Sequence, residues 1–238
     1  MNFTKTNSFP KAVALERSMG PNPLKLCEEL VDDAGIPVGS VVLDLGSGAG
    51  LTSALMAREF GFIVHAADLW SDPGDNMRFF ESVGLTNHEV VPLKADATAL
   101  PYACEFFDAV VSVDSYNYFG RDPGYLGTHL LPLVKRGGLL LFAIPGMTRD
   151  CHDDLPACLC KSWDAEQLDY MHDVNWWRAN IEQTEGVDIL DMREMACTAE
   201  AWADWLSCDN DYARGDRAAV EAGALDYLNT IAVKLRKR

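Results

Sequence analysis

The stretch Val41–Thr52, which reads VVLDLGSGAGLT, decides the fold of this 238-residue chain. It opens with a short apolar run, typical of a buried parallel strand, and then carries glycine at every second position. A helical run, Leu51–Phe60, follows and ends before Gly61. Strand, glycine turn and helix in this order predict the first unit of a nucleotide-binding α/β sheet.

The spacing of the three glycines, Gly46, Gly48 and Gly50, narrows the kind of ligand. A dinucleotide-binding loop reads G-x-G-x-x-G and holds a pyrophosphate at the helix N-terminus. Here the third glycine comes one residue early, and an acid, Asp44, stands two residues before the first. We expect this acid to disfavour a pyrophosphate and to suit a ligand that carries an ammonium group.

Composition and length exclude several classes of protein and partner. A hydrophobic fraction of 48% argues against disorder, and a formal net charge of −16 argues against nucleic acid as a partner. No apolar run approaches the roughly 18–20 residues of a membrane span, and the first residues lack the apolar core of a signal peptide. We therefore expect a cytoplasmic protein whose residues 1–238 form a single α/β domain.

The cysteines do not predict a metal site. There are seven, scattered along the chain, which is typical of reduced thiols in a cytosolic protein. A zinc site is an alternative where Cys151, Cys158 and Cys160 lie near His152. Their spacing matches no common zinc pattern, however, so we predict that the protein holds no metal.

Acids follow the predicted strands at regular places. Further strands are expected at 62–68, 88–93, 106–114 and 139–144, and helical segments alternate with them. This alternation predicts a parallel, doubly wound sheet, whose ligands bind at the carboxyl ends of its strands. The acids at or just beyond these ends are Asp44, Asp68, Asp96 and Asp114. Their placement favours a binding site over solvated loop charges.

The segment beyond Pro145 carries no comparable motif. Its patterns predict a helix from Asp164 to about Gln183, a strand over 186–195, a short helix over 198–206, a helix that Asp216 caps, and a last strand over 227–235.

Two further helices are expected earlier in the chain. Asn22 is expected to cap a helix that ends at Gly35, and another helix is expected from Asp122 to Val134.

Taken together, the motifs resemble those of the class I S-adenosylmethionine-dependent methyltransferases, in their small-molecule branch (methyltransferase type 11-like). The residues that carry the resemblance are Leu43–Gly50, Asp68, Asp96-Ala97 before Leu100-Pro101, Phe107–Val110 and the strand after Gly137-Gly138. The resemblance implies a Rossmann-like, doubly wound α/β sheet with helices on both faces and a helical cap or insert. The sheet would be mostly parallel, with an antiparallel last strand between the fifth and the sixth.

The resemblance divides the domain and implies S-adenosyl-L-methionine as its cofactor. The parts would be a helical leader (1–35), a cofactor-binding core (36–145), a substrate-side insert (146–185) and C-terminal strands and helices (186–238). Asp68 would bind the ribose hydroxyls and Asp96 the adenine amino group, while Asp114 would lie near the methionyl end. The expected cofactor-binding residues are Asp44, Gly46, Ser47, Gly48, Gly50, Asp68, Leu69, Trp70, Asp96, Ala97 and Asp114.

The predicted reaction is transfer of a methyl group to a small-molecule acceptor by in-line displacement. The protein must align a nucleophile and exclude water, and it needs a base only if the nucleophile arrives protonated. The candidate catalytic residues are Tyr116, Tyr118 and His152. We expect the acceptor between the turn 114–119, the loop 146–154 and the helix that bears His172 and Trp176.

Two alternatives remain at this point. An NAD(P)-dependent oxidoreductase of the Rossmann type is opposed by the glycine spacing and by Asp44. The second alternative is a protein of the same fold that binds the cofactor without transferring a methyl group. A product assay distinguishes such a protein from a methyltransferase.

Overall fold

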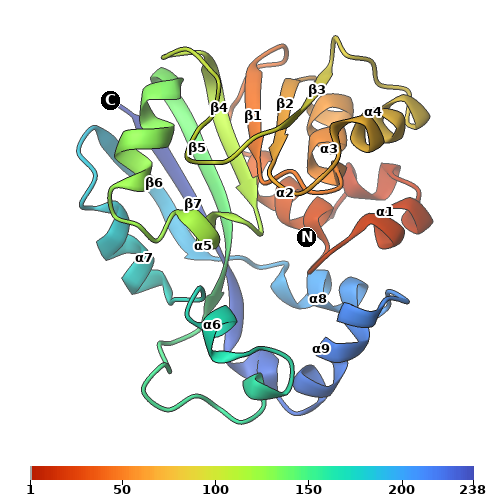
Figure 1. The fold of residues 1–238 in the computed structure, drawn as a ribbon, viewed down its shortest axis with the longest axis vertical. Helices are drawn as coiled ribbons and strands as arrows, with labels where there is room; N and C mark the ends of the chain where they lie inside the picture. Colours follow the sequence, from red (N-terminus) through yellow and green to blue (C-terminus); the bar gives the residue numbers. More distant parts are fainter. Residues whose placement is uncertain (1) are drawn as a thin grey trace.

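A single seven-stranded sheet organises the chain. The computed structural model describes residues 2–238, so Met1, where the predicted leader begins, lies outside the described residues. The strands are β1 (Val41–Leu45), β2 (Ile63–Asp68), β3 (Val90–Lys94), β4 (Phe107–Val113), β5 (Val134–Met147), β6 (Val187–Glu194) and β7 (Leu228–Lys237). They lie side by side in the order β3-β2-β1-β4-β5-β7-β6 (Figure 1).

The strand directions confirm the expected topology. Strands β1 to β5 pair in parallel, whereas β7 runs antiparallel to both of its neighbours, β5 and β6. The order of the strands reverses between β1 and β4. The loops that follow these two strands therefore lie at the switch point, where open α/β sheets bind their ligands.

Helices cover both faces of the sheet. They are α1 (Lys11–Arg17), α2 (Pro23–Val31), α3 (Leu51–Phe60), α4 (Pro73–Ser82), α5 (Tyr116–Phe119), α6 (Ala165–Leu168), α7 (Val174–Ile181), α8 (Thr198–Leu206) and α9 (Asp211–Glu221). Helices α2 and α3 contribute to the hydrophobic cluster on one face, and α5 and α7 to the cluster on the other. None of the helices within residues 2–238 has the length and apolarity that crossing a membrane requires.

A third hydrophobic cluster forms a cap beyond the sheet. It joins Trp202 and Trp205 of α8 to Ala213 of α9 and to Leu159 and Leu168 from the insert. Figure 1 shows α6, α8 and α9 together beneath the carboxyl ends of the central strands. The insert and the C-terminal helices, which are far apart in the sequence, thus combine to cover the edge where a ligand is expected.

Two predicted elements around β5 were wrong in extent. Strand β5 does not break at Pro145-Gly146 but continues to Met147, because β7 pairs with it along its length as far as Leu228. The helix expected from Asp122 to Val134 is a π-helical turn, Leu126–Leu130, followed by a 3-10 turn, Leu131–Leu133. Pro132 cannot donate a backbone hydrogen bond, so a regular α-helix does not pass through it.

Two predicted helices in the C-terminal half also differ. The long helix expected after Asp164 is divided into α6 and α7, because the chain leaves the helix and Asp173 caps a new one by accepting from Trp176 N. Helix α9 begins at Asp211 and is capped by Asn210, so Asp216 is not a cap but lies within the helix. Its carboxylate instead accepts hydrogen bonds from Ser162 Oγ and from Trp205 Nε1.

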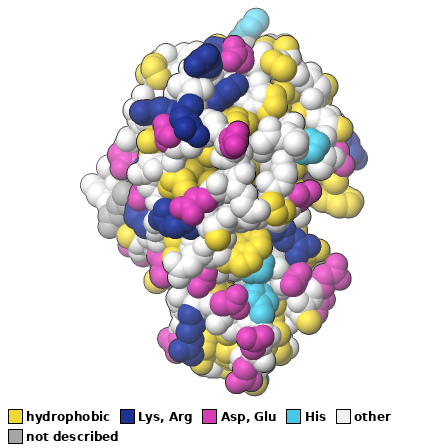
Figure 2. Space-filling view, turned by 90° about the vertical axis from the view of Figure 1, so that its left-hand side faces the viewer, with side chains coloured by type: hydrophobic (Ala, Val, Ile, Leu, Met, Phe, Trp, Pro, Cys, Tyr) yellow, Lys and Arg dark blue, Asp and Glu magenta, His cyan; other side chains and the backbone are white. Residues whose placement is uncertain are grey.

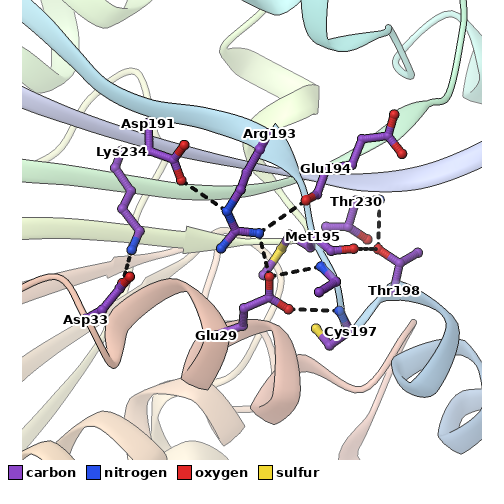
Figure 3. Close-up of polar contacts among 11 residues, drawn as sticks. Glu29, Asp33, Asp191, Arg193, Glu194, Met195, Cys197, Thr198, Thr230 and Lys234 are labelled. Atoms are coloured by element: carbon purple, nitrogen blue, oxygen red, sulfur yellow. Dashed lines mark hydrogen bonds and ion pairs between the residues drawn. The ribbon is translucent and has the colours of Figure 1, made fainter. Parts of the chain in front are cut away.

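A buried carboxylate ties the leader to the C-terminal part of the sheet. Glu29 of α2, whose residue is 2% exposed, accepts from Arg193 Nη1 at 2.6 Å and from the backbone N–H groups of Ala196 at 2.9 Å and Cys197 at 2.8 Å (Figure 3). Burial opposes its ionisation, but the hydrogen bonds from Arg193 and from Cys197 and Ala196 outweigh it and lower the pKa of Glu29. Helix α2, which Asn22 caps as expected, is thereby fixed against the end of β6.

Candidate active site

The glycine loop after β1 requires its glycines for two different reasons. Gly46, Gly48 and Gly50 all have positive φ, at 75°, 52° and 85°. A Cβ on Gly46 would lie 2.1 Å from Ser115 Oγ, and one on Gly50 would lie 2.7 Å from the Phe80 ring. A Cβ on Gly48 would meet nothing within 4 Å. Close packing therefore adds to the conformational requirement at Gly46 and Gly50, whereas at Gly48 only the backbone conformation calls for glycine.

We expect Gly46→Ala to destabilise the protein more than Gly48→Ala. Both variants place Ala at positive φ, which costs about 1–2 kcal/mol. Only Gly46→Ala also forces a collision with Ser115, and overpacking adds about 1–3 kcal/mol. Chemical denaturation of the two variants and the wild type measures the difference, and equal losses would contradict the packing role of Gly46.

Asp44 supports the loop from beneath. It is fully buried, and its Oδ2 accepts from Thr52 Oγ1 at 2.6 Å and Ser53 Oγ at 2.5 Å in the first turn of α3. Burial raises the pKa of Asp44 to about 6 against the effect of these two hydroxyls, and the charge of Asp68 adds to the rise. Asp44 does not line the adjacent cavity. Its Oδ2 anchors the start of α3, whereas its buried Oδ1 has no hydrogen-bond partner within residues 2–238.

A cavity of about 500 Å³ opens at the carboxyl ends of β1, β2 and β4. This volume lies in the range of small-molecule and cofactor sites. Of the eleven residues expected to bind the cofactor, those that line the cavity are Gly46, Ser47, Gly48, Asp68, Leu69, Trp70, Asp96, Ala97 and Asp114. The other two, Asp44 and Gly50, do not line it.

Asp68 and Asp96 both keep acceptor capacity toward the cavity. Asp68 Oδ2 accepts from Gly48 N at 2.9 Å, and its Oδ1 accepts from Trp70 N at 2.8 Å and Ser71 N at 2.7 Å. The carboxylate thus joins the glycine loop to the end of β2. Asp96 uses only Oδ1, toward the backbone and side chain of Thr98, and these bonds lower its pKa. Both side chains are therefore held in place as hydrogen-bond acceptors.

The leader closes the cavity from the opposite side. Met19, Gly20 and Pro21 line it, and so does Arg17, which the sequence analysis did not single out. Arg17 donates to Ala49 O from Nε at 3.0 Å and Nη2 at 2.8 Å, and its guanidinium lies 4.1 Å from the centre of the Phe79 ring. No local motif marks Arg17, because its partners are more than 30 residues away.

Asp114 stands where this cavity meets a second, smaller one of about 150 Å³. Its φ of 58° is unusual for a residue other than glycine, and its N–H donates to Ala143 O at 2.9 Å. Burial, together with the charge of Asp216, raises the pKa of Asp114 to about 7. The two cavities share Met19, Gly20, Pro21, Asp114 and Tyr118. Asp114 and Tyr118 can therefore contact a ligand in either cavity.

The structure brings only one of the three candidate catalytic residues to the cavities. Tyr118 is 62% exposed and lines both. Tyr116 is fully buried and stacks on Phe142 with ring centres 3.9 Å apart, so it supports the turn from below. His152 lines neither cavity. Its Nδ1 lies 2.7 Å from Asp150 Oδ1 and its Nε2 lies 3.1 Å from Leu168 O, and these contacts raise its pKa although burial opposes the rise.

The remaining expected acceptor segments are also only partly at the cavity. His172 stacks on Trp176 at 3.7 Å between ring centres, and neither residue lines the second cavity. The rings of His152 and His172 lie 5.0 Å apart. Figure 2 shows histidine side chains (cyan) at the surface in the lower half of its face. The insert residues that line the second cavity are instead Gly146, Trp163, Gln167, Tyr170 and Met171.

Asp150, His152 and His172 could together hold a metal ion, since one ligand atom from each lies within 4.8 Å of the others. That the protein holds no metal stays a prediction. None of the three residues lines either cavity, so a metal ion that they bound would lie outside the cofactor site. We expect dialysis against EDTA to leave the affinity for S-adenosylmethionine unchanged within twofold by calorimetry. A loss of affinity that zinc or magnesium restores would contradict this prediction.

Comparison with known proteins identifies the part of the chain that builds the larger cavity. Residues 43–142 match a family model described as a methyltransferase domain. This part of the chain is similar to that methyltransferase domain. The matched residues include most of β1, all of β2, β3 and β4, most of β5, and the glycine loop.

Two curated relatives are methyltransferases. The chain is 26% identical over 176 residues to the methyltransferase GfsG of Streptomyces halstedii, an alignment that covers 72% of this chain and 61% of that protein. It is 34% identical over 110 residues to the 2-methyl-6-phytyl-1,4-hydroquinone methyltransferase of Synechocystis sp., covering 45% of this chain and 33% of that protein. The chain thus spans less than two thirds of the length of either relative.

A solved structure confirms the fold over the whole chain. The phosphoethanolamine N-methyltransferase 2 of Haemonchus contortus, in complex with S-adenosyl-L-methionine, matches with a TM-score of 0.73 at 19% identity. The match covers 100% of this chain and 60% of that chain. The predicted class I methyltransferase fold, with β7 inserted antiparallel between β5 and β6, is therefore confirmed.

Proposed function

We propose that the protein is an S-adenosylmethionine-dependent methyltransferase that acts on a small-molecule acceptor by in-line displacement. One observation carries the proposal: nine of the eleven residues that the motifs assign to the cofactor converge on one cavity of a methyltransferase domain. When bound, the cofactor supplies a methyl group that its sulfonium already activates.

The lining of the larger cavity fits this cofactor. Ser47 Oγ is buried and has no hydrogen-bond partner within residues 2–238, so it is available to a ligand. Asp68 and Asp96 offer acceptors to hydroxyl and amino groups, and the exposed rings and chains of Trp70 and Leu69 offer apolar surface beside them. Asp114 supplies a carboxyl group at the end of the cavity nearest the second one.

The chain's own residues would align the acceptor and exclude water. Tyr118 and Asp114 face both cavities, so they can orient an acceptor group in the second cavity toward the cofactor in the first. The leader residues Met19–Pro21 cover the junction of the two cavities from outside. A closed junction limits the access of water to the reacting groups.

The charge of the larger cavity opposes the oxidoreductase alternative. Asp68, Asp96 and Asp114 all line it, and Arg17 is the single lysine, arginine or histidine among the lining residues within 2–238. A nicotinamide cofactor would place a doubly charged pyrophosphate among these carboxylates. This argument replaces the one from Asp44, which does not reach the cavity.

We expect calorimetry to show binding of S-adenosylmethionine and of S-adenosylhomocysteine, and no binding of NADH. Tighter binding of NADH than of S-adenosylmethionine would contradict the proposal. The remaining alternative, cofactor binding without methyl transfer, is tested with cell extract. Mass spectrometry should find a metabolite that gains one methyl group only when protein and cofactor are both present.

A further inference from the structure

The second cavity collects residues from across the whole chain. It lies between the leader at Met19–Pro21, the turn after β4, the end of α6, α8, α9 and the start of β7. At about 150 Å³ it is comparable with cavities that admit a benzene-sized molecule. It adjoins the larger cavity through Asp114 and Tyr118, so a ligand in it would lie beside the proposed cofactor.

The charge of this cavity is entirely negative. Asp114 and Asp216 line it, and no lysine, arginine or histidine does so among residues 2–238. Asp216 is held by Ser162 and Trp205, whereas the side chain of Asp114 has no hydrogen-bond or ion-pair partner in the described part of the chain. The two carboxylates are close enough for their charges to interact. A cationic ligand would supply the neutralising partner that the protein does not provide.

Two buried amides face the same cavity without partners. Asn229 of β7 is 6% exposed and both its Oδ1 and Nδ2 lack a hydrogen bond within residues 2–238. Asn117 of α5 is 2% exposed and its Oδ1 lacks one as well. Buried amide groups are nearly always paired in folded proteins, and both of these line the cavity. The two free oxygens call for N–H or O–H donors on a ligand.

Aromatic rings complete the lining. Trp163 and Trp202 meet edge to face with ring centres 6.0 Å apart, and Tyr118 lies 5.3 Å from Tyr170. The guanidinium of Arg121 already lies 4.0 Å from the Tyr170 ring, so the other three rings are the ones available to a ligand. The faces of such rings attract a desolvated cation.

We propose that the second cavity binds the cationic nitrogen of an amine-bearing molecule, with Asp114 and Asp216 as its charge partners and Asn117 and Asn229 as its hydrogen-bond partners. That this molecule is the methyl acceptor rests on the proposed function, whereas recognition of the cation does not. An ammonium must lose a proton before its nitrogen becomes nucleophilic. Asp114, whose pKa burial and Asp216 raise to about 7, can take up that proton at its carboxylate.

The test compares cations with neutral molecules of the same shape. Choline is paired with 3,3-dimethylbutan-1-ol, and benzylamine with benzyl alcohol, in calorimetric titrations of the full chain. In at least one pair the cation should bind tenfold or more tightly than its neutral partner. Neutral molecules that bind as tightly as the cations in both pairs, or no binding of either cation, would overturn the inference.

Two variants test whether the cation binds in the second cavity. Their results also distinguish a failure of this inference from a failure of the proposed methyltransferase function. Asp216→Asn should weaken cation binding at least tenfold and leave the affinity for S-adenosylmethionine unchanged, since Asp216 lines only the second cavity. Asp169→Asn, at a neighbouring acid that pairs with Arg121 outside the cavity, is the matched control and should change cation binding less than threefold. Unchanged cation binding in a folded Asp216→Asn variant would overturn the inference. Cation binding by a protein that does not bind S-adenosylmethionine would overturn the proposed function alone.

Discussion

Asp68→Ala is expected to weaken the binding of S-adenosylmethionine by about 1.5–3 kcal/mol, or roughly ten- to hundredfold. The carboxylate has two roles that the variant removes together. It offers acceptors to the ribose in our proposal, and it accepts from Gly48 N, Trp70 N and Ser71 N. Without it Gly48 N loses its bond to the end of β2, although Gly46 N and Ser47 N still donate to Ala67 O. Calorimetric titration of wild type and variant measures the change.

A control acid on α4 separates this effect from a general change of charge. Asp75 is exposed, pairs with Arg78 on the surface and does not line the cavity. Asp75→Ala should therefore alter the affinity by less than twofold. The unfolding midpoint of the Asp68 variant without cofactor should change little, because the bonds to Gly48 N, Trp70 N and Ser71 N are exposed or only partly buried, so water can replace the carboxylate. An unchanged affinity in Asp68→Ala would remove this residue from the site.

The sequence predicted the cofactor cavity well because its signals are local. A strand, a glycine turn and a helix are contiguous, and Asp68, Asp96 and Asp114 each stand at or just beyond the end of a strand whose apolar run is easily recognised. Parallel strands bring their carboxyl ends to one edge, so these acids had to meet. Asp44 differs because it belongs to β1 itself, where Thr52 and Ser53 of α3 cover its side chain. Which way a strand-end acid points depends on that packing.

The residues that line the second cavity could not be predicted in the same way, because they meet only through tertiary packing. Asp216 and Asn229 lie about 100 residues from Asp114 along the chain, and no spacing pattern links them. The path of the insert also decides which of its residues line the second cavity. Because the predicted long helix is divided after Leu168, Tyr170 and Met171 reach the cavity while His172 and Trp176 do not. His152, one of the candidate catalytic residues, also lies outside the cavity, and its Nε2 lies 3.1 Å from Leu168 O.

The buried network at Glu29 leads to the second large expected effect. Glu29→Ala should lower the free energy of unfolding by about 3 kcal/mol, because it leaves two backbone N–H groups, of Ala196 and Cys197, without an acceptor, each costing about 1–3 kcal/mol. It also removes the ion pair to Arg193. For a chain of this size the unfolding midpoint should fall by roughly 6–12 °C. Glu200→Ala, at an exposed acid on α8 that lies 3.6 Å from Lys25, is the control and should cost less than about 0.5 kcal/mol.

The pH dependence of this effect has a defined sign. Because the folded state lowers the pKa of Glu29, its ionised form stabilises the fold fully above the unfolded value of about 4.3. That contribution is lost as the pH falls through the lower, folded pKa. The difference in unfolding free energy between wild type and Glu29→Gln should therefore shrink below about pH 4.3. A difference that stays constant from pH 7 to pH 3 would show that the charge of Glu29 does not stabilise the fold. Since α2 begins at Pro23, which lines the cofactor cavity, loosening this helix should also weaken the binding of S-adenosylmethionine.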